Sequence, residues 1–285
     1  MLYLFTVCTG LLGSLLGVWV SLELSNVFVV VLGILTGSRA SAALEYFFVQ
    51  ALASLALVSG FIISLPVCIW GGLMLKLGLF PCFSWVFRVI FGFNVFLGFV
   101  IILGLQKMVP LLLVWVGCEF GCVSVVSLLC CLSMLSGVVL MAYSGDLKCL
   151  MVSSSFIHTS WVLLLMVWGV TYWVLYLLCY LLLISFLSFS VHYNWGWFTG
   201  GLVMSFSAIP PLFGFIVKVV SGLAVSGYYW FYVLVFLLVG GVSVCWYSKI
   251  FFVLFMTPSS DVGVWGVLMG SVLVMILGWV SVVLI

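Results

Sequence analysis

Residues 73–85, LMLKLGLFPCFSW, place a lysine and a proline inside an apolar run long enough to cross a membrane. About 20 apolar residues in a helix span the hydrocarbon core of a bilayer. A charge at the centre of such a helix costs at least about 2.5–3.5 kcal/mol, and a proline removes a helical hydrogen bond. The stretch therefore predicts a transmembrane helix that is interrupted at Pro81 and carries a functional charge at Lys76.

The whole chain has the composition of a membrane protein. Of its 285 residues, 68% are hydrophobic and 4% are charged, whereas about 25% of a soluble domain is charged. We expect an all-α, polytopic transmembrane bundle of about ten or eleven helices, forming a single transmembrane domain over residues 1–285. The chain has no basic patch, which excludes nucleic acid as a partner.

The apolar segments are separated by very short polar connections. Helices are expected at 2–12, 14–37, 42–64, 67–91, 94–117, 120–142, 147–169, 171–190, 199–226, 229–253 and 262–284. A helix rises about 1.5 Å per residue, so the segment 2–12 is too short for a full span, and the count is ten or eleven.

Prolines are expected to interrupt three of these helices. They are Pro81 in the segment 67–91, Pro110 in 94–117, and the pair Pro210–Pro211 in 199–226. Unpaired backbone groups inside a membrane are tolerated only against protein or a water-filled cavity. Interrupted helices are therefore typical of transporters, although a simple kink is the alternative for each proline.

Four basic residues near segment ends indicate the orientation of the bundle. With alternating helices, Arg39, Arg88, Lys148 and Lys249 all fall on one side. The positive-inside rule makes that side the matrix or the cytoplasm. We expect these four side chains to extend toward the membrane surface.

Five ionisable residues lie deep in apolar segments instead: Glu23, Lys76, Lys107, His158 and Lys218. Intramembrane ionisable residues are rare and usually functional. The alternatives are structural ion pairs for the charged residues and a satisfied polar core residue for His158. The stretch SSSFIHTSW, residues 153–161, surrounds that histidine with hydroxyl groups and favours a hydrated polar patch.

The buried charges do not balance, because three lysines accompany a single glutamate. A buried lysine without an acidic partner exchanges its proton more readily than a lysine in water. We therefore interpret the five residues as proton-translocation sites, with a moving Glu23–Lys76 pair able to drive a proton against a membrane potential.

Redox chemistry has no visible site in the sequence. There is no GxGxxG for a dinucleotide, no cysteine cluster for iron–sulfur, and no paired membrane histidines for haem. We expect no cofactor and no metal site in this chain. The N-terminal residues match neither a transit peptide nor a cleavable signal, and the residue usage suggests a strand-biased organelle genome.

Six stretches recur in the order of a known family. They are VWVSLELSN (18–26), LEYFFVQALAS (44–54), LMLKLGLFPCFSWV (73–86), LGLQKMVPLLL (103–113), DLKCLMVSSSFIHTSW (146–161) and SAIPPLFGFIVKVV (207–220). Together they resemble the family of NADH-ubiquinone oxidoreductase chain 2, the mitochondrially encoded, antiporter-like subunit of respiratory complex I. The resemblance covers most of residues 15–225.

The resemblance implies a proton-translocating membrane-arm subunit in the mitochondrial inner membrane. By it, Glu23 is the acidic partner of Lys76, Lys107 is the next relay lysine, and Lys218 lies near the exit half-channel. His158 matches the histidine of the family's Ser-Ser-x-x-His stretch. NADH, FMN, iron–sulfur clusters and ubiquinone would belong to other subunits of the complex, so the chain is part of an enzyme without holding a redox centre.

Other membrane-arm subunits, neighbouring antiporter-like subunits among them, are the implied partners, together with membrane lipids such as cardiolipin. Two alternatives stay open. The first is a subunit of a cation/proton antiporter complex that is not coupled to NADH oxidation. The second is a structural subunit in which the lysines form permanent ion pairs and neutral replacement of both partners is harmless.

Overall fold

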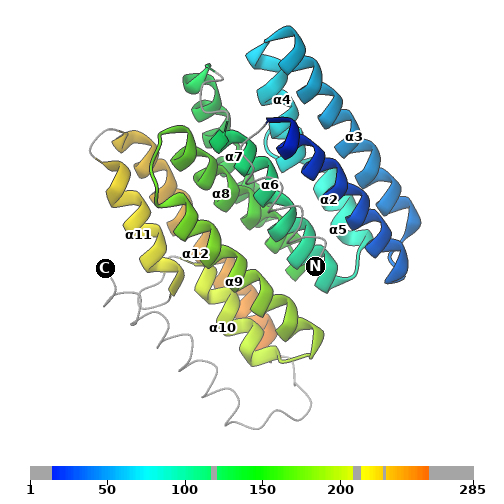
Figure 1. Cartoon of the computed structure of the whole chain (residues 1–285). Helices are drawn as coiled ribbons and strands as arrows, with labels where there is room; N and C mark the ends of the chain where they lie inside the picture. Colours follow the sequence, from blue (N-terminus) through cyan, green and yellow to red (C-terminus); the bar gives the residue numbers. More distant parts are fainter. Residues whose placement is uncertain (1–14, 117–120, 208–212, 227–228, 257–285) are drawn as a thin grey trace.

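The fold is a bundle of inclined helices (Figure 1). The structure is a computed structural model that describes residues 15–116, 121–207, 213–226 and 229–256. Its elements are α2 (Leu15–Leu35), α3 (Ala40–Ile63), α4 (Pro66–Leu77), α5 (Ser84–Gly92), the π-helix η1 (Leu97–Leu105), α6 (Gln106–Val116), α7 (Val123–Ala142), α8 (Leu147–Val167), α9 (Trp173–His192), α10 (Gly196–Phe206), α11 (Phe213–Ser226) and α12 (Trp230–Met256).

The described part confirms an all-α multi-pass membrane protein. Each expected segment from 14–37 to 229–253 contains either one helix or two consecutive helices. Six helical stretches within the described residues are long and apolar enough to span a membrane, and three shorter apolar helices accompany them. The expected helices at 2–12 and 262–284 lie outside the described residues.

The interruption expected at Pro81 is confirmed. Helix α4 ends at Leu77, and Gly78 follows with a φ of 67°, in the left-handed region that favours glycine. Any side chain at Gly78 would collide with Val86, whose Cγ2 lies 2.3 Å from the position of an added Cβ. The segment 67–91 is therefore two helices, α4 and α5, which are separated by a tight turn and both pack against α3.

The segment 199–226 is also divided into two helices. Helix α10 ends at Phe206 and α11 begins at Phe213, while Pro210 and Pro211 lie outside the described residues. The two halves approach closely at Gly214, where an added Cβ would lie 1.9 Å from the Ser205 carbonyl oxygen. Only glycine fits this contact between backbones.

The interruption expected at Pro110 is wrong. Pro110 lies inside α6, which continues past it to Val116. A proline leaves the carbonyl four residues earlier without its helical bond, and here that residue is Gln106, where the π-helix η1 passes into α6. The wider π-helical turns precede the proline, so the irregularity is absorbed before Pro110 without a break in the helix.

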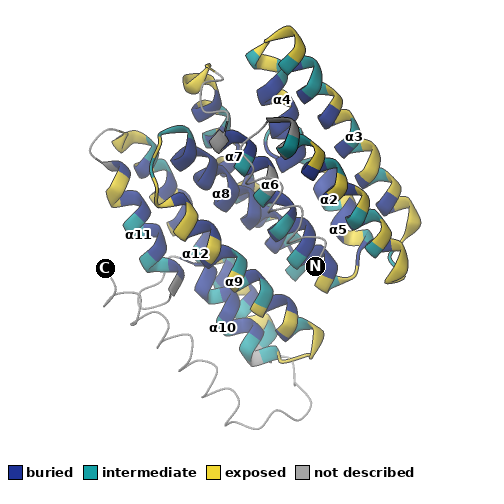
Figure 2. Cartoon of the chain, viewed as in Figure 1, coloured by how far each residue is buried: buried dark blue, intermediate teal, exposed yellow. Residues whose placement is uncertain are grey.

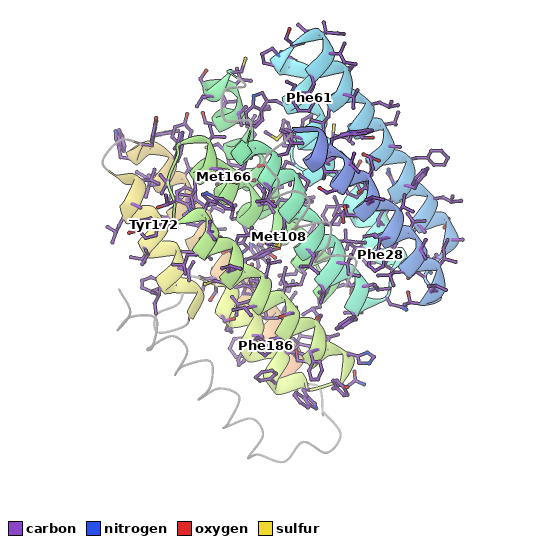
Figure 3. All side chains as sticks on the ribbon, viewed as in Figure 1. Phe28, Phe61, Met108, Met166, Tyr172 and Phe186 are labelled. Atoms are coloured by element: carbon purple, nitrogen blue, oxygen red, sulfur yellow. The ribbon has the colours of Figure 1, made fainter. Side chains whose placement is uncertain are left out.

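Helix α8 forms the centre of the bundle (Figure 2). Every residue from Leu150 to Met166 is buried, including the hydroxyl residues around His158. It contacts α5, α6, α7, α9 and α12. Helices α3 and α12, by contrast, expose large apolar side chains such as Leu52 and Phe252, and Figure 3 shows Phe186 and Tyr172 projecting outward from the ribbon. Polar groups inside and apolar groups outside are the arrangement that lipid favours.

Three of the four basic residues expected on one side lie at one end of the bundle. They are Arg39, Arg88 and Lys148. The Arg39 backbone N–H donates to the Gly92 carbonyl over 3.0 Å, and the exposed Arg88 pairs with Glu45. Lys148 does not simply extend to the surface as expected, because its Nζ donates to the Phe93 carbonyl over 3.0 Å. This lysine stabilises the C-terminal end of α5, where a helix dipole favours a positive charge.

Candidate functional site

Glu23 and Lys76 form an ion pair between α2 and α4. The Lys76 Nζ donates to Glu23 Oε1 over 3.2 Å. The lysine side chain is fully buried, whereas 32% of the glutamate side chain is exposed. Lys76 lies in the last turn of α4, so the negative end of the helix dipole adds to the attraction of the carboxylate. The pairing expected from the sequence is present in the structure.

A group of buried amides adjoins this pair. Gln50 Nε2 on α3 donates to the Lys76 carbonyl over 3.3 Å. On α2, the Asn26 side-chain oxygen accepts from Tyr46 Oη over 3.2 Å and from Gln106 Nε2. The sequence analysis did not single out these residues. Glutamines and an asparagine inside apolar spans are a signal that could have revealed them, since such side chains need partners in a membrane.

Lys107 is the second residue of α6, directly after Gln106, and its side chain reaches α8. Its Nζ donates to Ser155 Oγ over 3.0 Å and lies 5.9 Å from the centre of the Phe156 ring. The structure gives this buried lysine a hydroxyl and an aromatic face as partners, and it forms no ion pair among the described residues. Ser155 Oγ donates in turn to the Val152 carbonyl over 2.6 Å, so in this structure the hydroxyl only accepts from Lys107.

His158 faces α9 from the centre of α8. Its Nδ1 is 2.7 Å from Tyr176 Oη, and its ring packs against Tyr180 with the centroids 5.1 Å apart. The histidine also interacts electrostatically with Lys107 and Lys218. The histidine is therefore within electrostatic range of both lysines.

Lys218 stabilises the end of the second broken helix. Its Nζ donates over 2.7 Å to the carbonyl of Phe206, the last residue of α10. The lysine therefore reaches back from α11 to the negative end of α10. Both broken helices share this feature, because the C-terminal end of α4 carries Lys76 and the C-terminal end of α10 binds Lys218.

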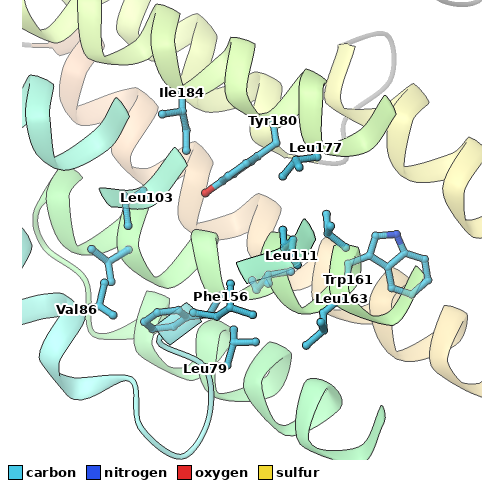
Figure 4. Packing of buried hydrophobic residues seen from close by; sticks show 14 of the residues in the cluster. Leu79, Val86, Leu103, Leu111, Phe156, Trp161, Leu163, Leu177, Tyr180 and Ile184 are labelled. Atoms are coloured by element: carbon cyan, nitrogen blue, oxygen red, sulfur yellow. The ribbon is translucent and has the colours of Figure 1, made fainter. Parts of the chain in front are cut away.

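A cavity of about 20 Å³ lies between His158 and Lys218, a volume that matches about one water molecule. Tyr176, Tyr180, Phe206 and Val217 also line it. Figure 4 shows Tyr180 reaching from α9 into the packed core. Its hydroxyl interacts with Ser155 without the geometry of a hydrogen bond.

The five residues expected from the sequence thus form two groups. Glu23 and Lys76 form one, and Lys107, His158 and Lys218 form the other. No direct contact joins Lys76 to Lys107 among the described residues, although the helices that carry them, α4 and α6, contact each other. Tyr176 and Tyr180 were missed, because buried tyrosines in an aromatic-rich chain give no signal in the sequence.

Comparison with known proteins identifies the class of fold. No protein-family model matches the sequence, and no curated protein matches it. Among solved structures, a chain of the membrane-bound sulfane sulfur reductase, an archaeal respiratory membrane complex, superposes with a TM-score of 0.79 at 13% identity, covering 99% of this chain and 72% of that chain.

Two further structures agree with this class. A chain of respiratory complex I from Thermus thermophilus has a TM-score of 0.75 at 20% identity, covering 97% of this chain and 78% of that chain. A chain of the Mrp complex from Dietzia sp. has a TM-score of 0.77 at 16% identity and covers 91% of this chain. The present chain spans 60% of the length of that Mrp chain. The chain therefore shares its fold with a chain of each of these three complexes.

Proposed function

We propose that the chain is a proton-translocating, antiporter-like subunit of the membrane arm of NADH:ubiquinone oxidoreductase, respiratory complex I. The observation that supports this most is the pairing of each broken helix with a buried lysine. Half-helix ends and buried lysines together provide charge sites at which a proton can be held and released. The six ordered sequence stretches favour complex I within the wider class, and its chain 2 as the particular subunit.

In this function the Glu23–Lys76 pair and the Lys107–His158–Lys218 group act as successive proton sites. Lys76 exchanges its proton while Glu23 balances the charge. Lys107 passes protons across Ser155 toward His158, and the cavity beside His158 has room for one water molecule before Lys218. Electron transfer from NADH to ubiquinone, with FMN and iron–sulfur clusters, would take place in other subunits.

The proposed location is the mitochondrial inner membrane, with neighbouring antiporter-like subunits and lipids as partners. A second candidate is a subunit of a cation/proton antiporter complex that is not coupled to NADH oxidation. The chain superposes on the Mrp-complex chain as well as it does on the complex I chain, with TM-scores of 0.77 and 0.75. The fold therefore supports both candidates equally.

The first experiment separates the two candidates. Native membranes that contain the chain are solubilised in mild detergent and separated on a native gel, which is stained for NADH dehydrogenase activity. Peptides of this chain are then sought by mass spectrometry. Co-migration with a large, NADH-active band supports the complex I subunit. Migration in a smaller complex without NADH activity overturns it, and cation-dependent proton flux becomes the next assay.

A further inference from the structure

The Asn26 side chain carries a hydrogen-bond donor that the Glu23–Lys76 pair does not use in this structure. Asn26 lies on α2, three residues after Glu23, and only 2% of it is exposed. Its Nδ2 is buried and has no hydrogen-bond partner among the described residues. Buried amide groups are nearly always paired, and an unpaired one is costly. This donor therefore needs an acceptor in some state of the protein.

The hydrogen bonds around Asn26 fix which end of its amide is left unpaired. Ser25 Oγ donates to the Leu22 carbonyl over 2.8 Å, so this hydroxyl can only accept from Gln106 Nε2, which is 3.4 Å away. The same amino group of Gln106 then meets the Asn26 side chain, which must present its oxygen. Tyr46 Oη donates to that oxygen as well. Both partners thus occupy Oδ1, and Nδ2 stays available.

Glu23 is the carboxylate best placed to reach that donor. Residues three apart on a helix are neighbours on its surface, and an ionised carboxylate accepts several hydrogen bonds. The other acidic residues in the described part are Glu45, which pairs with Arg88, and Asp146, at the start of α8. Glu23 is partly exposed, so its side chain is not confined by packing on every side.

We propose that Asn26 is a second binding position for the Glu23 carboxylate, occupied whenever the bond between Glu23 and Lys76 opens. Tyr46 and Gln106 hold the asparagine oxygen and thereby keep its amino group in place. The carboxylate would then exchange one buried partner for another without becoming unpaired. The move would also bring the negative charge toward Gln106, the residue directly before Lys107. Its role in proton transfer rests on the proposed function, but the exchange of partners does not.

Infrared spectroscopy of the purified complex that contains this chain tests the proposal. The carboxyl band of Glu23 is the band that disappears in Glu23→Gln. We compare the effect of Asn26→Leu on this band in two backgrounds, one with Lys76 and one with Lys76→Met, which keeps the pair open. We expect Asn26→Leu to shift the band to higher wavenumber only in the Lys76→Met background, because a carboxyl group that loses a hydrogen bond absorbs there.

Asn94→Leu is the matched control. Asn94 also uses its side-chain amide, whose Nδ2 donates to the Thr36 carbonyl over 2.7 Å, but it lies at the end of the bundle. It should shift the Glu23 band in neither background. Asn26→Ala repeats the test with a smaller side chain, and native-gel migration shows which variants assemble.

Two results would overturn the proposal. If Asn26→Leu left the wavenumber of the Glu23 band unchanged in both backgrounds, Asn26 Nδ2 would bind a water molecule or nothing. An equal shift in both backgrounds would mean that the substitution at Asn26 alters the surroundings of Glu23 whether or not the pair is open. The readout does not depend on transport, so a complex that proves not to translocate protons through this chain would contradict the proposed function while leaving this result intact.

Discussion

The Glu23–Lys76 pair and the Lys107–His158–Lys218 group place buried lysines in two different electrical environments. Lys76 contacts a carboxylate at 3.2 Å, and that carboxylate is partly exposed. Among the described residues, Lys107 and Lys218 donate to neutral oxygens, a serine hydroxyl and the carbonyl at the end of α10 respectively. The first region is a balanced pair, whereas the second has no acidic side chain among the described residues within ion-pairing distance.

This difference suggests that the two regions have different functions in proton transfer. A paired charge changes its energy only when its partner moves or is neutralised, so the first region suits a switch. Buried lysines with hydroxyl and carbonyl partners, beside a histidine that both charges influence, suit the passage of protons. Substitutions in the two regions should therefore have different effects on proton translocation.

Neutralising the ion pair should have the largest effect. Lys76→Met leaves the Glu23 carboxylate without its partner, and we expect proton translocation by the reconstituted complex to fall about 100-fold, at the lower end of what a positioned proton-transfer group contributes. The double variant Glu23→Gln with Lys76→Met should assemble normally on native gels, because no unpaired charge remains, yet stay inactive in translocation.

Lys249→Met, at an exposed position near the end of α12, is the control for this pair and should translocate normally. If the double neutral variant translocated protons at the original rate, the pair would be a structural ion pair and the division between the two regions would disappear.

Lys218→Met should have the next largest effect. It leaves the Phe206 carbonyl at the end of α10 without its donor, a loss of about 1–3 kcal/mol in stability. It should also slow translocation, but less than Lys76→Met does, because one proton site is removed while the Glu23–Lys76 pair is kept. Lys148→Met is a matched variant, since Lys148 caps α5 in the same way at the end of the bundle.

We expect Lys148→Met to lower the melting temperature comparably and to keep translocation. Thermal melting in detergent and proton uptake by vesicles measure the two effects separately. Equal losses of translocation in both variants would show that helix capping, and not the position beside His158, explains the importance of Lys218.

Adding a methyl group where the two halves of the second broken helix meet should lower the stability of the protein. In Gly214→Ala the new methyl group would lie 1.9 Å from the Ser205 carbonyl, and because that carbonyl is part of the backbone, we expect a loss of about 1–3 kcal/mol or more. Gly201→Ala on α10 meets no atom within 4 Å and should melt near the original temperature. Similar melting of both variants would contradict the close contact.

Removing the two tyrosine hydroxyls should have the smallest effects and should differ between them. Tyr176→Phe deletes the hydroxyl beside His158 Nδ1 and should cost about 1 kcal/mol. Tyr180→Phe removes a hydroxyl without a hydrogen-bond partner and should change the free energy of unfolding by less than about 0.5 kcal/mol. Chemical unfolding of the two variants compares the two losses. A larger loss in Tyr180→Phe would mean that Tyr176 is not the tyrosine whose hydroxyl binds His158.

Much of the candidate site could be predicted from the sequence because charges are expensive in a membrane. Glu23 and Lys76 were expected as partners, and the structure places them in contact. The break at Pro81 was also predicted, because a proline removes a helical hydrogen bond. Pro110 was misjudged, since a proline interrupts a helix only where the neighbouring turns cannot absorb it, and here η1 precedes it. Asn26, Gln106 and Tyr176 were missed, because neutral polar residues carry a smaller penalty and so a weaker signal.

The amino-acid sequence alone is enough to predict an all-α membrane protein, the helices within residues 15–256, and the burial of Lys76, Lys107 and Lys218. These properties follow from local hydrophobicity, helix length and the cost of a charge in lipid, and each of them depends only on residues that are close together in the sequence. The packing of the helices determines which atoms meet: Lys107 with Ser155, His158 with Tyr176, and Lys218 with the carbonyl of Phe206. Such contacts depend on how helices that are far apart in the chain pack and rotate against one another. An almost uniformly apolar sequence does not specify this rotation, which is set by the shapes of the side chains in the assembled bundle.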